Sequence, residues 1–304
     1  MRVRGFFRFT SVLAVALALS AGGCGKKNHK APAASAGSGS TAGSSAGSAA
    51  GSAGSAGSAA AAGSGSAAQL PPVLTSTTPQ GAVDAADRPA EDKALDAGRR
   101  PAELITFLGI GRGMKVAEIL AGGGYTTELL ARVVGPEGTV FAQNTPEILQ
   151  KFAEKPFSDR LARLKMPWIV RADTPLTAPL PDDAKDLDMV VANLVYHDTV
   201  GMGVDRAAMN SAIWKSLKPG GLYAIIDHTA KPGSGEQAAK DLHRIDPKFV
   251  QTEVEKAGFV LDRTSNMYAN PKDTLDWNAS PMAAGDKRGT SDRFVMVFRK
   301  QTGQ

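Results

Sequence analysis

The sequence predicts an α/β protein built on a mostly parallel, doubly wound β-sheet. Apolar strand-like segments alternate with helical patterns, and a glycine-rich loop joins the first strand to the following helix. Alternation of this kind favours a parallel sheet with helices on both faces. Ordinary, charge-bearing composition begins only near Gly81. We therefore expect one such domain over residues 81–304.

The expected elements follow in order along this segment. Pro89 and Pro101 each mark the start of a helix within 87–109, because proline is tolerated in a first helical turn. Strands are expected at 115–120, 139–143, 168–172, 187–193, 222–227, 259–265 and 294–299. Helices are expected at 126–134, 146–155, 205–217 and 247–257. The last two strands have no helical pattern between them, which indicates an antiparallel strand at the C-terminal edge.

The N-terminal residues have the pattern of an export signal. Arg2, Arg4 and Arg8 precede the apolar run 11–21, which small residues follow. The run is well short of the roughly 20 residues that a membrane-spanning helix needs. The pattern therefore predicts a secretory signal peptide over 1–23.

Cys24, the only cysteine, directly follows Ala21-Gly22-Gly23. This arrangement resembles a bacterial lipobox, in which the cysteine carries lipid and becomes the mature N-terminus, although that motif prefers Leu at the place of Ala21. Gly25 rather than Asp comes next, which favours the outer membrane by the same resemblance. We expect an exported chain, lipid-anchored on the periplasmic side of the outer membrane. The alternative is a secreted protein with an incidental cysteine.

Residues 24–80 are expected to form a flexible tether. Nearly all of 31–68 is Ala, Gly or Ser, which offers nothing to bury. The positive net charge also belongs to the N-terminus, because six of the 35 Lys and Arg residues precede residue 31, leaving 29 basic against 30 acidic residues. The folded part therefore has no basic excess, and we expect no nucleic-acid partner.

The segment Met114–Leu130 contains a glycine-rich loop that is a candidate for cofactor binding. An apolar strand containing Glu118 runs into Gly122-Gly123-Gly124, and a helical pattern follows. A strand, glycine loop and helix in this order are typical of nucleotide-like cofactor sites. The third glycine of a dinucleotide fingerprint is absent, Tyr125 stands beside the loop, and no P-loop Gly-Lys-Ser/Thr occurs.

Three landmarks in order resemble the class I S-adenosylmethionine-dependent methyltransferases. They are the run from Val116 to Gly124, the turn and strand from Leu217 to Leu222, and Ala257-Gly258-Phe259. Further motifs, among them Arg99-Arg100-Pro101 and Asp227-His228, resemble a bacterial group of predicted methyltransferases. The resemblance implies a Rossmann-like fold of seven strands with an antiparallel C-terminal edge strand, and S-adenosylmethionine as cofactor.

The resemblance also implies the cofactor-binding residues. Glu118 and the loop would face the methionine and ribose, Asn144 stands where the family has the acid that grips the ribose hydroxyls, and Asp173 would read the adenine. Leu120 replaces the first loop glycine and could narrow the cofactor cleft. The expected set is Glu118, Ala121, Gly122, Gly123, Gly124, Tyr125, Asn144, Asp173 and Asn193. For Asp173 the alternative is a simple turn cap.

Histidines gather where the methyl acceptor would bind. Ligands of open parallel sheets bind beyond the C-terminal strand ends, and His197, His228 and His243 all follow the fourth or fifth strand. A near-neutral imidazole suits the removal of a proton from an acceptor. We expect His197 or His228 to be this base, with Tyr196 and Asp198 lining the acceptor pocket.

Other functions stay open at this stage. Arg244 would pair with an anionic acceptor or bridge to Asp246. The three histidines with Asp198, Asp227 or Asp246 would alternatively form a metal site, although their spacing matches no ligand motif and no resident metal is expected. An exported domain also has no evident supply of S-adenosylmethionine, so a non-catalytic ligand-binding or scaffold lipoprotein is the second alternative. The acceptor, whether a small molecule or another compound, is not identified.

Overall fold

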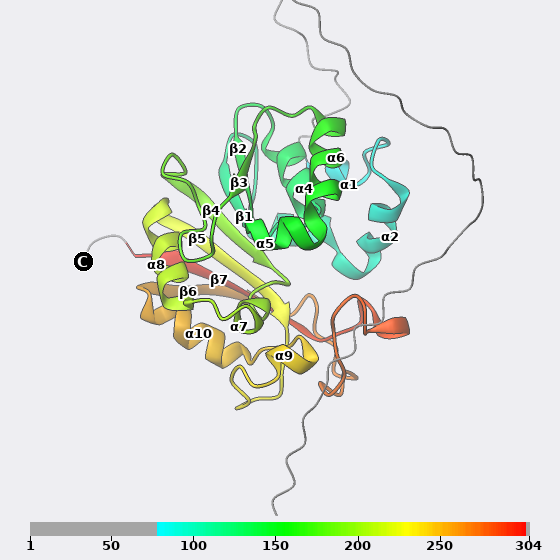
Figure 1. Ribbon diagram of the computed structural model, residues 1–304, viewed down its shortest axis with the longest axis vertical. Coiled ribbons are helices and arrows are strands. Elements are labelled where there is room, and N and C mark those ends of the chain that lie inside the picture. The colour runs from blue at the N-terminus through cyan, green and yellow to red at the C-terminus, as the bar shows by residue number, and fades with distance from the viewer. Residues whose placement is uncertain (1–77, 302–304) are drawn as a thin grey trace, which may run out of the picture. The chain divides into compact units, whose positions relative to one another are not determined.

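The computed structural model describes residues 78–301, and its centre is a single seven-stranded sheet of order β3-β2-β1-β4-β5-β7-β6 (Figure 1). The strands are β1 Lys115–Ile119, β2 Thr139–Asn144, β3 Ile169–Asp173, β4 Leu187–Asn193, β5 Leu217–His228, β6 Phe259–Ser265 and β7 Arg293–Lys300. β1 to β5 pair in parallel, whereas β7 is antiparallel to both of its neighbours. The sheet is thus seven-stranded, mostly parallel and Rossmann-like, as expected.

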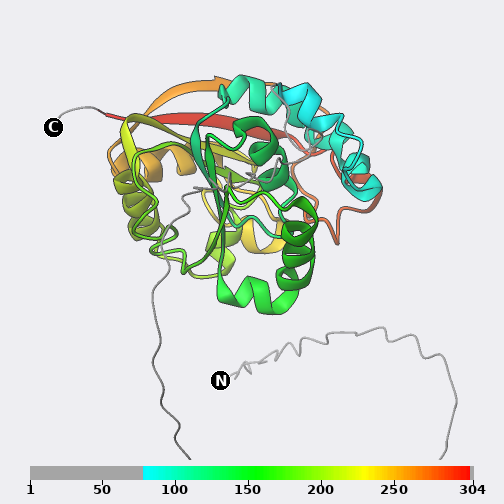
Figure 2. The same cartoon turned by 90° about the horizontal axis from the view of Figure 1, so that it is seen from above.

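Helices cover both faces of the sheet (Figure 2). They are α1 Pro79–Val83, α2 Ala90–Arg99, α3 Pro101–Leu108, α4 Tyr125–Val134, α5 Pro146–Ile148, α6 Glu154–Leu164, α7 Asp198–Gly201, α8 Arg206–Ser216, α9 Ala239–Leu242 and α10 Pro247–Lys256. A π-helical turn, Leu149–Ala153, joins α5 to α6, and a 3₁₀ turn covers Gly285–Lys287.

The alternation of side chains along the strands divides the core into two layers. On β5, Ala224 and Ile226 belong to the layer beneath α3 and α4, while Tyr223 and Ile225 belong to the layer beneath α8 and α10. Because successive side chains of a strand point to opposite faces, a sheet buried on both sides needs continuous apolar runs. The sequence supplies such runs, and this confirms the predicted doubly wound sheet.

The antiparallel pairing expected at the C-terminal edge is confirmed, because β7 is antiparallel to β5 and to the edge strand β6. Two details differ from the expected elements. β5 begins at Leu217 rather than Leu222, since Leu217 already pairs with Leu187. The helix expected to end at Lys155 continues through the π-helical turn to Leu164.

The predicted signal peptide, Cys24 and most of the predicted tether lie outside the described residues. Within 78–301 no helix combines the length and the apolar character needed to cross a bilayer.

Gly138, at the turn into β2, offers a test of the packing. A Cβ at this residue would lie 2.5 Å from the carbonyl oxygen of Met114 and 2.8 Å from Cβ of Val134. Because moving backbone atoms costs more energy than rotating a side chain, we expect Gly138→Ala to lower the free energy of unfolding by about 1–3 kcal/mol. Urea denaturation measures this, with Gly111→Ala as control, because a Cβ there meets nothing within 4 Å. Equal losses in both variants would contradict the packing argument.

Candidate functional site

The glycine loop after β1 adopts backbone conformations that favour glycine. Gly122 and Gly124 have φ of 57° and 81°. A Cβ at Gly122 would meet nothing within 4 Å, so this part of the loop borders open space. A Cβ at Gly124 would instead crowd Phe157 and Arg160 at 3.0 Å. One glycine therefore leaves room for a ligand, and the other lets α6 pack closely.

Leu120 retains the glycine-like backbone of the position that it occupies. Its φ is 52°, although its side chain is almost fully buried in the core layer beneath α8 and α10. Its backbone N–H donates to Oε1 of Gln143 at 3.0 Å. The side chain thus packs in the core, and its effect on the width of the cofactor cleft stays a prediction.

Asn144 is engaged with the loop itself. Its Oδ1 accepts from the backbone N–H of Gly122 at 2.8 Å, and its Nδ2 donates to the Gly122 carbonyl oxygen at 3.1 Å. The residue is fully buried. In this structure the amide thus holds the glycine loop to the end of β2, and contact of Asn144 with a ribose stays a prediction, because each of its polar atoms can form a further hydrogen bond.

Glu118 is a buried carboxyl group at the end of β1. Thr127 donates a hydrogen bond to its Oε2, and the residue is 4% exposed. Burial raises the pKa of Glu118 to about 7, against the lowering effect of Thr127, Thr126 and the more distant Arg99 and Arg160. The carboxyl therefore changes charge near neutral pH, and a cationic ligand group beside it would favour the ionised form.

The remaining expected cofactor residues lie around this loop. Ala121 accepts from the N–H of Gly124 at 2.9 Å and donates its own N–H to the Gln143 carbonyl at 2.8 Å. Nδ2 of Asn193, at the end of β4, lies 3.4 Å from Oγ1 of Thr126. Asp173 is half-exposed at the end of β3, and Arg171 donates to both of its carboxylate oxygens. An adenine-reading role for Asp173 stays a prediction.

Tyr125 and Arg99 close the loop from the side of α2. The Tyr125 hydroxyl donates to Asp96 at 2.5 Å, and the guanidinium of Arg99 lies 4.3 Å from the centre of the Tyr125 ring. Among residues 78–301 nothing accepts a hydrogen bond from the Arg99 side chain and no acid pairs with it. Burial lowers the pKa of Arg99, which remains a cation beside Glu118 and Tyr125. An unpaired guanidinium of this kind suits an anionic ligand group.

The C-terminal end of α2 is fixed by residues from the far end of the chain. Arg293 donates to the carbonyl oxygen of Gly98 at 2.7 Å, and Tyr268 donates to that of Arg99. Arg100 pairs with Glu103 and donates to the Met267 carbonyl. The backbone that carries Arg99 is thus held in place while its guanidinium stays free.

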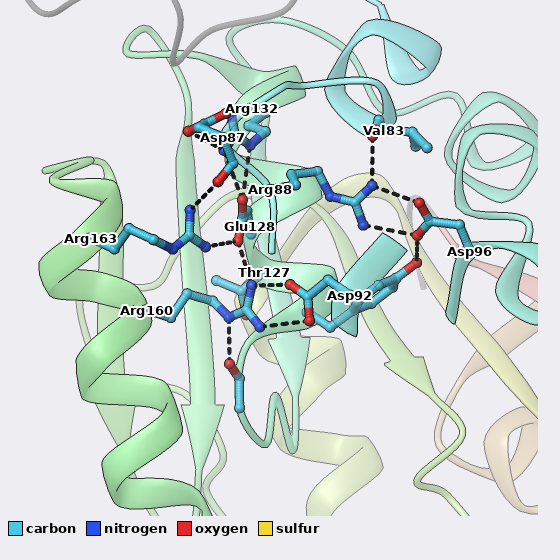
Figure 3. A network of polar contacts seen from close by, with 12 residues as sticks. Val83, Asp87, Arg88, Asp92, Asp96, Thr127, Glu128, Arg132, Arg160 and Arg163 are labelled. Carbon is cyan, nitrogen blue, oxygen red and sulfur yellow. Dashed lines mark hydrogen bonds and ion pairs between the residues drawn. The ribbon is translucent and has the colours of Figure 1, made fainter. Parts of the chain in front are cut away.

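A buried network of charges joins α2, α4 and α6 behind the loop (Figure 3). Glu128 contacts Arg132 at 2.8 Å and also pairs with Arg160 and Arg163. Arg160 pairs with Asp92 at 2.5 Å and donates from Nε to the Gly123 carbonyl at 2.6 Å. The network therefore fixes the outer side of the glycine loop through Arg160.

The histidines expected near the acceptor lie together beyond β4 and β5. Nδ1 of His197 lies 2.6 Å from Asp227, and Nε2 lies 3.1 Å from Nδ1 of His243 and 3.1 Å from Oδ1 of Asp198. Asp227 is fully buried and also accepts the backbone N–H groups of His197 and His228. Burial opposes charge on His197, but Asp227 and Asp198 outweigh it and raise its pKa to about 10.

His228 is chemically different from His197. Its Nδ1 lies 2.7 Å from the Ser291 hydroxyl, and no described residue forms a hydrogen bond with its Nε2. Burial lowers its pKa to about 3, so the imidazole is neutral. Of the two expected bases, His228 alone has an unengaged ring nitrogen, because both nitrogens of His197 have partners.

Two side chains lie elsewhere than expected. Tyr196 is 1% exposed, and its hydroxyl joins Glu253 of α10 at 3.1 Å to Asn210 of α8 at 3.0 Å. It packs between helices instead of lining an acceptor pocket. Arg244 is fully buried and pairs with Asp273 at 3.0 Å, not with Asp246, which caps α10.

A family model matches the part of the chain that holds the glycine loop. The family model of protein-L-isoaspartate(D-aspartate) O-methyltransferase matches residues 84–173, which hold α2 to β3 and the glycine loop. A comparison with curated protein sequences finds no match. The family match, together with the strand order, makes S-adenosylmethionine the expected cofactor.

Solved structures of methyltransferases resemble the chain as well. A SAM-dependent methyltransferase from Aquifex aeolicus has 18% identity and a TM-score of 0.48 over 70% of this chain and 98% of that one. A SAM-dependent O-methyltransferase from Thermotoga maritima has 16% identity and a TM-score of 0.43, over 68% of this chain and 66% of that one. An arsenic(III) S-adenosylmethionine methyltransferase from Chlamydomonas reinhardtii has 18% identity and a TM-score of 0.44. The match covers 77% of this chain and 75% of that one.

The raised pKa of Glu118 predicts a pH dependence of stability. The native state keeps this proton up to about pH 7, whereas the unfolded chain loses it near its ordinary value of 4.5. The contribution of Glu118 is thus complete below pH 4.5 and declines as pH rises to 7, by about 3 kcal/mol. Glu118→Gln, which imitates the neutral form, should remove this decline in urea denaturation between pH 4.5 and 7. Parallel pH profiles of the two proteins would contradict it.

Proposed function

We propose that this chain transfers a methyl group from S-adenosylmethionine to an acceptor bound beyond β4 and β5. The observation that carries the proposal is the glycine loop, whose open space at Gly122 lies in the same site as the buried Glu118 and the unpaired Arg99. The expected cofactor has a carboxylate, an ammonium and a sulfonium, so a site for it needs a cation and an acid near a close backbone approach. These residues meet that need.

Residues of opposite charge would bind the oppositely charged groups of the cofactor. Arg99 would hold the carboxylate of the methionine part, because its guanidinium has no acid partner among residues 78–301 and its backbone is fixed. Glu118 would face the positive groups in its ionised form. Gly122 lets the backbone approach without a Cβ, while Asn144 and Arg160 keep the loop in shape from either side.

Methyl transfer is a displacement in which the acceptor atom forms a bond to the methyl carbon as the bond from that carbon to the sulfonium sulfur breaks. The bound cofactor supplies only the methyl group, so acceleration comes mainly from holding the two reactants in line. Where the acceptor must lose a proton, Nε2 of His228 is available as a ring nitrogen without a hydrogen-bond partner among the described residues. Its pKa of about 3 makes it a weak base, however, so positioning would contribute more than proton removal. Ser291 orients the ring through Nδ1.

A second candidate function rests on Asn144. Asn144 stands where the family has the acid that binds the ribose hydroxyls, and its amide already bonds to Gly122, so the charge-assisted bond is missing. This favours a non-catalytic ligand-binding or scaffold protein that keeps the fold. The two candidates differ in whether the chain binds the demethylated cofactor.

Calorimetric titration of the full chain with S-adenosylhomocysteine tests the proposal. We expect micromolar binding, and Arg99→Ala should weaken it by roughly 10- to 100-fold, the effect of losing one charge-assisted bond of about 1.5–3 kcal/mol. Arg112→Ala is the control, because it removes an equal charge from an exposed pair with Glu137. Absence of binding at millimolar ligand would favour the non-catalytic alternative, and an equal loss in the control would remove Arg99 from the site.

We also propose that the domain is tethered to a membrane through lipid on Cys24. The support is the basic start, the short apolar run and the small residues before the cysteine. Cys24→Ser should move the chain from the membrane fraction to the soluble fraction of cells that produce it. Unchanged fractionation of the variant would contradict the lipid anchor.

A further inference from the structure

His197, Asp198 and His243 place three ligand atoms at the corners of a small triangle. Nε2 of His197 is 3.1 Å from Nδ1 of His243 and 3.1 Å from Oδ1 of Asp198, and these two atoms are 3.3 Å apart. An ion held in tetrahedral geometry at about 2.0–2.1 Å from its ligands separates them from one another by about 3.3 Å. The triangle thus has the dimensions of one face of a metal coordination shell.

Hydrogen bonding alone satisfies all three atoms only if both imidazoles donate to Asp198. A proton on Nε2 of His197 can face both other atoms, but it leaves Nδ1 of His243 and Oδ1 of Asp198 as two acceptors 3.3 Å apart. Protons on both imidazoles would bring two N–H groups within 3.1 Å of each other. A cation bound between the three atoms would accept a lone pair from each of them and remove these conflicts.

The support of His197 is the kind that metal-bound histidines have. Asp227, fully buried, accepts from Nδ1 of His197 at 2.6 Å and from two backbone N–H groups. A carboxylate in this place fixes the tautomer and orientation of a ligating imidazole and raises its basicity. His197 therefore presents Nε2 toward the triangle as a fixed ligand.

The other two ligands leave a path to solvent. The side chains of Asp198 and His243 are 38% and 34% exposed. His243 has a φ of 49°, a left-handed backbone that directs its ring from the end of α9, while the buried Arg244 next to it anchors the segment. An ion could enter here and keep a coordination position for another molecule.

We propose that His197, Asp198 and His243 bind a divalent transition-metal ion of the Zn²⁺ class. Two imidazoles and one carboxylate suit such ions, whereas Mg²⁺ and Ca²⁺ prefer oxygen ligands alone. The site lies beyond the ends of β4 and β5, where the methyl acceptor is proposed to bind, so the free coordination position would hold an oxygen, nitrogen or sulfur atom of that molecule. This last role rests on the proposed function, whereas the metal site itself does not.

Titration of the full chain with Zn²⁺, after removal of metals with a chelator, tests the site without any cofactor. We expect one ion per chain with micromolar or tighter affinity, a rise in the thermal midpoint, and visible absorption bands of tetrahedral type when Co²⁺ replaces Zn²⁺. Mg²⁺ and Ca²⁺ should not compete. Weaker than millimolar Zn²⁺ binding would overturn the proposal.

Variants decide whether these residues are the ligands. His243→Ala and Asp198→Asn should each weaken Zn²⁺ binding by 100-fold or more, with the fold checked by circular dichroism without metal. Asp241→Asn is the matched control, because Asp241 is an exposed acid on α9, two residues before His243. Binding retained in the ligand variants, or lost in the control or in His29→Ala, would overturn the assignment. S-adenosylhomocysteine binding is measured separately, so either proposal can fail alone.

Discussion

The parallel pairing of β1, β4 and β5 is the constraint on which the rest of the structure depends. Ile119 pairs with Ala192 and Asn193 pairs with Ile226, so the carboxyl ends of the three strands meet at one edge of the sheet. Each chain segment that leaves this edge then starts next to the others. The glycine loop and the histidine cluster are neighbours for this reason, although they lie 70 to 120 residues apart in the sequence.

A network of charges adds to apolar packing in holding α2, α4 and α6 together on the cofactor side of the sheet. Glu128, 1% exposed, faces three arginines, and Asp92 and Asp87 complete the set. Buried charges are costly to desolvate, and removing one partner leaves the others uncompensated. A network of this kind specifies one arrangement of the three helices more than it adds stability, and Arg160 transmits that arrangement to the loop.

The sequence predicted what depends on local pattern. The strands, the glycine loop, α4 and the strand-end histidines follow from periodicity and glycine chemistry, and the structure has them. The bonds between Asn144 and Gly122 could not be predicted, because the two residues lie 22 positions apart in the sequence. Arg99 and Arg100 are adjacent and the sequence does not distinguish them, yet only Arg100 forms an ion pair with Glu103. The contact of His197 with His243 spans 46 residues and needs the order of β4, β5 and α9.

The hydrogen bonds from Tyr268 and Arg293 to the end of α2 constrain the order in which parts of the molecule fold. The bonds from Tyr268 to Arg99 and from Arg293 to Gly98 span 169 and 195 residues. Contacts between such distant parts form late, because closing a long loop costs entropy before any bond repays it. A ribosome delivers Arg99 well before β7, so a half-made chain has its glycine loop but not a fixed Arg99. In the proposed site, a chain that ends before β7 therefore has a less firmly held Arg99 and should bind S-adenosylmethionine more weakly.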